Sequence, residues 1–179
     1  AFSILNPALT QTLPPYQTAA GITDIMAHLF ERYFTNTKDV EVTDRMIEAL
    51  LLTMIHEAPR VMEDPNNYEA RANIMWAGMM AHNNSCGVGR TQDWASHDIE
   101  HELSAMYDCA HGAGLAVVMP AVFTYNMKHD VMRYAKVAER VWGCKMDETC
   151  PENTAKAGIE AFRNFLCSIG MPKNFEELG

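Results

Sequence analysis

Histidines gather in one stretch of the chain, residues 93–114, which reads DWASHDIEHELSAMYDCAHGAG. His97 and His101 stand four residues apart there, so on a helix both side chains project from the same face, one turn apart. His111 comes just before two glycines, where a helix could end and the chain could turn back toward the same point. Asp24 and His28 repeat the four-residue interval inside an upstream apolar segment. This spacing predicts that side chains from separate helices converge on one metal ion.

The donor atoms indicate which kind of ion this would be. The predicted ligand set has one carboxylate and three imidazoles: Asp24, His28, His97 and His111. Such a set suits a first-row transition ion much better than Ca²⁺, and it accepts both Fe²⁺ and Zn²⁺. Polar groups embedded in apolar helices need a shared reason to be there, and a metal ion supplies one. The remaining histidines, His56, His82 and His129, are interpreted as packing residues.

Other functions share parts of this spacing. His97 and His101 resemble the two-histidine helix of zinc proteases, but Asp98 stands where those enzymes need a glutamate, and the third histidine comes ten residues later. A phosphohydrolase of the helical histidine-aspartate type is conceivable from the pair His97 and Asp98. A helical metal-dependent hydrolase is therefore one alternative, which would require Asp98 or Glu100 to face the ion with a bound water. A non-catalytic interaction module with merely packed histidines is the other.

The segments that must position these residues have apolar side chains at helical spacing and lack the sustained alternation of an exposed strand. Helices are expected at residues 16–34, 42–62, from about 67 to 82, 94–106, 110–127, 130–141 and 151–169. Asn66 with Glu69, and Thr149 with Glu152, have the spacing of capping boxes. Only the apolar run 115–119 also fits a strand. The prediction is an all-α multi-helix bundle that forms a single domain over residues 1–179.

The composition of the chain argues against some classes of binding partner. The chain has 14 Lys and Arg against 23 Asp and Glu, a formal charge of -9, which argues against nucleic acid or an anionic membrane. No apolar run approaches the roughly 18–20 residues of a membrane span, and the first residues lack the basic start and apolar block of a signal peptide. A cytoplasmic protein that acts on small molecules, with no nucleic-acid or membrane partner, is expected.

Four motifs resemble one known family. They are NPALTQTLPP at 6–15, GITDIMAHLFERYFT at 21–35, DWASHDIEHELSAMYDCAHGAGLAVVMPA at 93–121 and KVAERVWG at 136–143. In this order they resemble the C-terminal, all-helical half of the iron-dependent (group III) alcohol dehydrogenases, of the butanol dehydrogenase and aldehyde reductase type, whose fold is dehydroquinate synthase-like. The chain departs from the family at Asn6, where members have aspartate before the proline.

The resemblance implies a role for each candidate residue. It places the family's metal ligands on Asp24, His28, His97 and His111, its proton-relay or cofactor-positioning histidine on His101, and a cofactor-side residue on Leu9. It implies an NAD(P)-dependent enzyme that interconverts alcohols and aldehydes with Fe²⁺ or Zn²⁺ as Lewis acid, and it allows a homodimer. It also implies that residues 1–179 are a metal-binding, catalytic domain and a fragment, without the family's nucleotide-binding domain and final helices.

Overall fold

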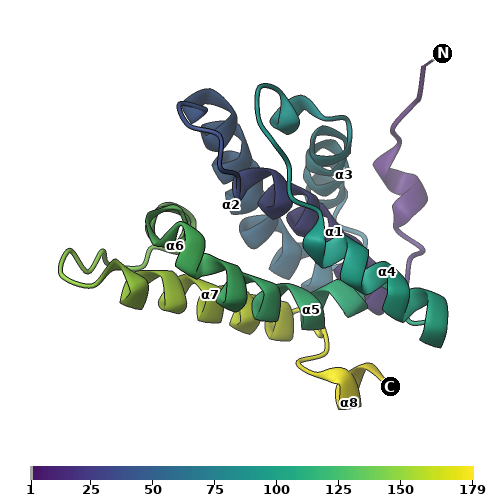
Figure 1. The fold of residues 1–179 in the computed structure, drawn as a ribbon. Helices are drawn as coiled ribbons and strands as arrows, with labels where there is room; N and C mark the ends of the chain where they lie inside the picture. The colour runs from purple at the N-terminus through teal and green to yellow at the C-terminus, as the bar shows by residue number, and fades with distance from the viewer. Residues whose placement is uncertain (1) are drawn as a thin grey trace.

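The computed structural model describes residues 2–179, and the regular elements in that range are all helical (Figure 1). The long helices are α1 (Pro15–Tyr33), α2 (Glu41–Glu63), α3 (Tyr68–His82), α4 (Ala95–Tyr107), α5 (His111–Asn126), α6 (Val131–Trp142) and α7 (Pro151–Ser168). The short elements are η1 (Pro7–Thr10), η2 (Ser85–Gly87), η3 (Met127–His129) and α8 (Phe175–Leu178). The predicted all-α class is confirmed, and the ambiguous run 115–119 lies inside α5. No helix among the described residues is long and apolar enough to cross a membrane.

Helix α1 is the centre of the bundle. Thirteen of its nineteen residues are buried, and it packs against α2, α3, α4 and α5. In Figure 1, α2 and α3 lie on one side of α1, and α5 and α7 lie on the other. Apolar side chains such as Met26, Leu29 and Phe30 fill the space between these layers. Burial of this apolar surface holds α1 in place, so the polar residues of α1 are held between neighbouring helices as well.

Helices α1 and α5 approach each other closely at Gly112. A Cβ atom at this position would overlap the carbonyl group of Ala20, so only glycine permits the contact. Ala20 lies one turn before Asp24 on α1, and Gly112 directly follows His111. The close approach of the two backbones therefore brings His111 next to Asp24.

Two predicted helix caps differ from those observed. Asn67, not Asn66, caps α3, because its side chain accepts a hydrogen bond from the backbone N–H of Ala70 (3.0 Å). The predicted capping box at Thr149 is also wrong, since α7 has Cys150 at its N-cap without a side-chain cap. The Thr149 hydroxyl donates instead to Asp147 (2.7 Å). Before α3, Asp64 has the corresponding role, because its Oδ1 accepts a hydrogen bond from the backbone N–H of Asn66 (3.0 Å). The spacing of the predicted capping residues did not reveal either aspartate.

A buried cluster of charges joins α2 to α6 and to the segment before α4. Asp44 on α2 is 2% exposed, and its Oδ1 accepts hydrogen bonds from Arg90 (2.8 Å) and Arg133 (2.5 Å). Arg90 also donates to the Arg32 carbonyl oxygen (2.8 Å) at the end of α1. Because a buried charge is costly without a partner, this cluster fixes how the three segments pack together.

Candidate metal centre

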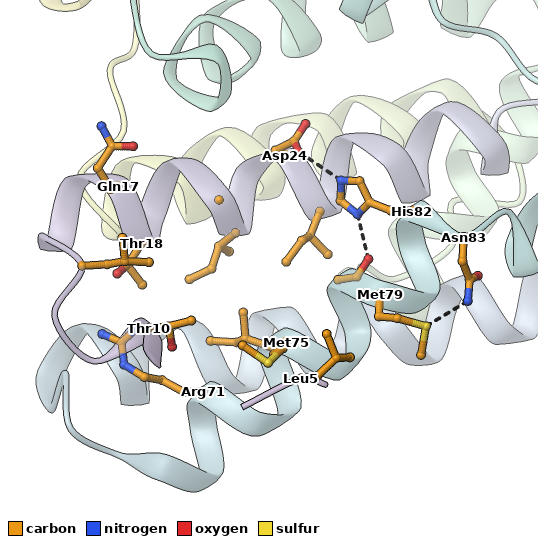
Figure 2. A pocket seen from close by; sticks show the side chains of 16 residues that line it. Leu5, Thr10, Gln17, Thr18, Asp24, Arg71, Met75, Met79, His82 and Asn83 are labelled. Atoms are coloured by element: carbon orange, nitrogen blue, oxygen red, sulfur yellow. Dashed lines mark hydrogen bonds and ion pairs between the residues drawn. The ribbon is translucent and has the colours of Figure 1, made fainter. Parts of the chain in front are cut away.

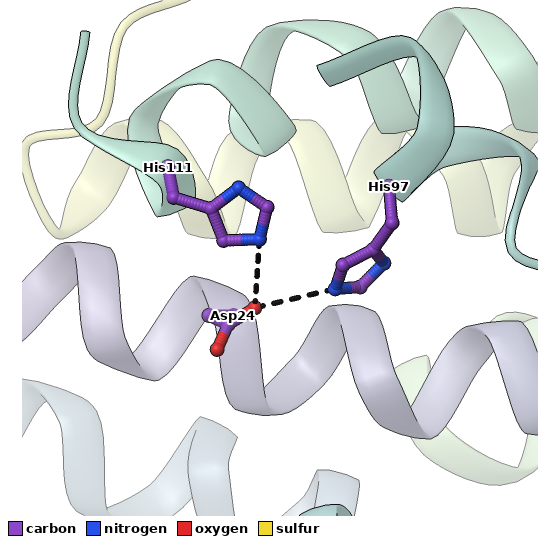
Figure 3. Close-up of side chains that lie close together, drawn as sticks. All are labelled: Asp24, His97 and His111. Carbon is purple, nitrogen blue, oxygen red and sulfur yellow. Dashed lines mark ion pairs between the residues drawn. The ribbon is translucent and has the colours of Figure 1, made fainter. Parts of the chain in front are cut away.

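Asp24 is the residue around which the predicted ligands meet. Its Oδ1 lies 3.4 Å from His97 Nε2, 3.4 Å from His111 Nε2 and 3.6 Å from His28 Nε2. The residues come from three helices: Asp24 and His28 from α1, His97 from the first turn of α4, and His111 from the start of α5. Figure 3 shows the imidazoles of His97 and His111 directed at the Asp24 carboxylate. The structure thus brings together the side chains that the sequence predicted to converge.

Two buried glutamates orient the imidazoles. Glu31, 3% exposed, accepts hydrogen bonds from the backbone N–H groups of Ser96 (2.8 Å) and His97 (3.2 Å), and also contacts His97 Nδ1. Glu100 has no exposed surface and contacts His111 Nδ1 in the same way. A carboxylate that accepts the Nδ1 proton leaves the Nε2 lone pair free for a metal. Both histidines therefore present Nε2 toward Asp24.

The space between these atoms fits a small cation. Asp24 Oδ1 and His97 Nε2 are buried without a hydrogen-bond partner among the described residues, which is unusual for polar atoms in a folded protein. Around a tetrahedral zinc ion with bonds of about 2.0–2.1 Å, ligand atoms lie about 3.3–3.4 Å apart. The 3.4 Å separations of Asp24 Oδ1 from His97 Nε2 and from His111 Nε2 match this spacing. The donor set and these two separations therefore fit a transition-metal ion.

His82 joins the cluster from the C-terminal end of α3. Its Nε2 lies 3.2 Å from Asp24 Oδ2, its Nδ1 lies 2.7 Å from the Gly78 carbonyl oxygen, and its ring centroid is 3.9 Å from that of His28. Two groups of three potential ligands share Asp24: one with His97 and His111, the other with His28 and His82. The interpretation of His82 as a packing residue did not foresee this contact with Asp24. Residues 24 and 82 are far apart in the sequence, and no spacing pattern links them.

The other predicted site residues lie at the edge of this cluster or outside it. The exposed His101 stacks on His111, with ring centroids 5.1 Å apart, and so adjoins the centre from the solvent side. Leu9 lies on η1 and is 76% exposed. Asp98 is exposed on α4, and Glu100 is engaged with His111. Neither acid is placed as the base that the hydrolase alternative requires.

The carboxylates and imidazoles shift one another's pKa values. Burial alone would raise the pKa of the Asp24 carboxyl, but the imidazoles of His111, His82 and His97 outweigh it and hold that pKa below its ordinary range. Burial lowers the pKa of His97, yet Asp24 and Glu31 outweigh burial and raise it from 6.5 to about 9. For His28, burial dominates and lowers the pKa to about 4. Protons and a metal ion would therefore compete for the same ligand atoms.

Gly114 lets Glu100 reach His111. A Cβ atom at position 114 would overlap the Glu100 carboxylate, so we expect Gly114→Ala to displace this group and to release His111 Nδ1. Loss of such an outer partner typically lowers metal affinity about 10- to 100-fold. Titration of Zn²⁺ against a competing chelator measures this. Gly21→Ala is the matched control, because a Cβ atom on that helical glycine has no neighbour within 4 Å. Wild-type affinity in Gly114→Ala would contradict the assigned role of Glu100.

The chain is similar to known proteins along almost its whole length. Residues 18–179 match the Fe-containing alcohol dehydrogenase family, C-terminal domain. The chain is 41% identical to the NADPH-dependent aldehyde reductase YqhD of Escherichia coli and 42% identical to the NADH-dependent butanol dehydrogenase B of Clostridium acetobutylicum. Each alignment covers 99% of this chain and 46% of the relative, so the chain spans about half the length of the proteins it matches.

Solved structures show the same fold. The chain superimposes on the substrate- and cofactor-free form of Escherichia coli YqhD with a TM-score of 0.91 and 38% identity, over 96% of this chain and 44% of that one. The NADH-dependent butanol dehydrogenase A of Thermotoga maritima gives a TM-score of 0.91 and 37% identity, over 96% of this chain and 42% of that one. The helical arrangement around Asp24 is therefore that of about half of each enzyme.

Proposed function

The chain belongs to the Fe-containing alcohol dehydrogenase family, and on that premise we propose that it is the metal-binding helical domain of an NAD(P)-dependent enzyme that interconverts alcohols and aldehydes. One observation carries the proposal: Asp24 Oδ1 and His97 Nε2 are buried without a hydrogen-bond partner among the described residues. His111 Nε2 lies 3.4 Å from the same Asp24 oxygen. Because the chain spans 46% of its relatives, we propose that a separate nucleotide-binding domain supplies the rest of the cofactor site. A cytoplasmic location is part of the same proposal.

Each residue of the centre has a proposed task. Asp24, His28, His97 and His111 would hold Fe²⁺ or Zn²⁺, which when bound supplies Lewis-acid polarisation of an alcohol or aldehyde oxygen. Glu31 and Glu100 keep two of the imidazoles in the tautomer that binds a metal. The exposed His101 would carry the hydroxyl proton between the substrate and solvent. The exposed Leu9 would lie on the cofactor side of the cleft.

Metal content and hydride transfer test the proposal separately. The purified chain, exposed to Fe²⁺ or Zn²⁺ and then desalted, should retain close to one equivalent of ion by elemental analysis. Joined to the nucleotide-binding domain of a relative, it should oxidise NADH or NADPH in the presence of butanal. His56→Ala is a control variant that should retain the ion as the wild type does, because the His56 imidazole is 71% exposed and contacts Glu57 rather than the cluster. If the chain retains the ion but oxidises neither NADH nor NADPH, the site assignment stands and the proposed reaction is wrong.

The pH dependence of the metal-free chain should follow His97. Because the folded pKa of about 9 lies above the ordinary value of 6.5, protonated His97 stabilises the fold. That stability is fully present below pH 6.5 and is lost as the pH rises toward about 9. At about 1.4 kcal/mol per pKa unit, the loss is at most roughly 3–4 kcal/mol. Zinc affinity should rise over the same interval, since fewer protons compete for the ligands.

Urea unfolding with a chelator present, at a series of pH values, measures this loss of stability. His97→Gln should reduce the dependence between pH 6.5 and about 9, because glutamine does not titrate. The dependence that remains comes from His82 and His111, because hydrogen bonds with Asp24 raise their pKa values as well. A variant that keeps the wild-type slope would show that other groups cause the dependence.

A further inference from the structure

A pocket of about 670 Å³ lies between α1 and α3, where the N-terminal segment covers part of it (Figure 2). Its walls are mostly apolar and come from both helices and the N-terminal segment: Leu13, Ile22, Ile25, Ile74, Met75 and Met79. Apolar walls of this kind favour a hydrocarbon ligand, because its burial removes apolar surface from water.

The two ends of the pocket differ from its walls and from each other. At one end lie Asp24 and His82, so the pocket adjoins the metal centre described above. At the other end Figure 2 shows Arg71 beside Thr10. From residue 18 to residue 24 along α1, the pocket extends over about 9 Å, given a rise of about 1.5 Å per residue.

Arg71 is a cation without an anionic partner. Only 4% of this residue is exposed, and its Nε donates to the Pro65 carbonyl oxygen (2.5 Å). Among the described residues no carboxylate lies within 4.0 Å of its guanidinium. A buried guanidinium is costly unless an anion pairs with it, and its planar fork suits a carboxylate. The far end of the pocket is therefore built to receive a negatively charged group.

We propose that this pocket binds a medium-length alkyl chain whose far end carries a carboxylate, which Arg71 recognises. The reacting carbon then lies at the Asp24 end, so the substrate is an ω-hydroxy or ω-oxo carboxylic acid. This inference rests on the proposed alcohol and aldehyde chemistry for the identity of the reacting end. The pocket itself and its anionic preference do not depend on that chemistry, because they follow from the walls and from Arg71.

Calorimetric titration of the metal-free chain with octanoate, octan-1-ol and octylammonium tests the anionic preference. A chelator must be present throughout, so that no carboxylate binds to a metal ion instead. Octanoate should bind most tightly and octylammonium most weakly. Hydrogen bonds to charged groups contribute about 1.5–3 kcal/mol, so Arg71→Met should weaken octanoate binding about 10- to 100-fold and leave octan-1-ol almost unchanged.

Matched variants separate charge from folding. Arg71→Lys keeps the charge and should retain most of the preference for octanoate, although it changes the contact with Pro65 as Arg71→Met does. Arg163→Met removes a cation from an exposed pair with Glu160 and should have no effect on binding.

Gly21 lines the pocket, and a Cβ atom there has no neighbour within 4 Å. Gly21→Leu should therefore block octanoate binding without lowering the melting temperature. Gly21→Ala should weaken octanoate binding only slightly.

The outcomes separate this inference from the proposed function. Equal binding of octanoate and octan-1-ol, or an unchanged octanoate affinity in Gly21→Leu, would overturn the inference whatever the metal content. If octanoate binds as expected, the complete enzyme should oxidise 8-hydroxyoctanoate with a lower KM than octan-1-ol, and Arg71→Met should remove that difference. An enzyme that oxidises both alcohols with equal KM would overturn the substrate class alone and leave the metal-dependent chemistry intact.

Discussion

Asp24→Ala should abolish tight metal binding, with a loss of affinity greater than the roughly 100-fold that removal of an outer partner costs. Asp24 is the only carboxylate in the ligand set, and its Oδ1 lies within 3.6 Å of three imidazole nitrogens. Without it the site loses its negative charge and the atom that all the other ligands face. Zn²⁺ titration against a chelator, together with elemental analysis after desalting, measures the loss.

Two further variants make this result specific. Asp24→Asn keeps the size of the side chain but removes the charge, and it should lose most of the affinity too. Asp98→Ala removes an exposed carboxylate from the helix that carries His97, and it should bind zinc as the wild type does. Retention of a full equivalent of ion by both Asp24 variants would show that the metal lies elsewhere.

Asp44→Ala should destabilise the fold by about 3–5 kcal/mol, the range typical of breaking a buried ion pair by removing one partner. Asp44 is 2% exposed, and its loss leaves Arg90 and Arg133 without this carboxylate in the interior. The free energy of unfolding in urea measures the effect. Glu160→Ala, which breaks the exposed pair with Arg163, is the control and should cost less than about 1 kcal/mol. A loss of that small size in Asp44→Ala would mean that the buried cluster does not hold the three segments together.

The helices and most of the metal centre could be predicted from the sequence because both follow from local spacing. Apolar residues recur along α1 at helical intervals, and the four-residue interval from Asp24 to His28 places both side chains on one face. His97 and His111 were predicted as partners because both lie in one histidine-rich stretch, and polar groups embedded in apolar helices need a shared reason to be there. The structure places both nitrogens at 3.4 Å from the Asp24 carboxylate.

The remaining residues of the centre depend on how helices cross, which local spacing does not record. His82 reaches Asp24 only because the end of α3 lies beside α1, 58 residues away in sequence. Glu31 and Glu100 have ordinary helical positions, and only their burial against His97 and His111 shows that they orient ligands. A glutamate predicted inside an otherwise apolar helix face is the one sequence signal that points to such a role.

The contact between Gly112 and Ala20 makes the size of the ion-binding space a property of the backbone. Any side chain at position 112 would push α5 away from α1 and carry His111 away from Asp24 with it. The radius of the ions that the proposed site would accept is therefore set one residue away from His111, by the separation of two helices. A homologous site could change its preference between small and large divalent ions through position 112 alone, with every ligand retained.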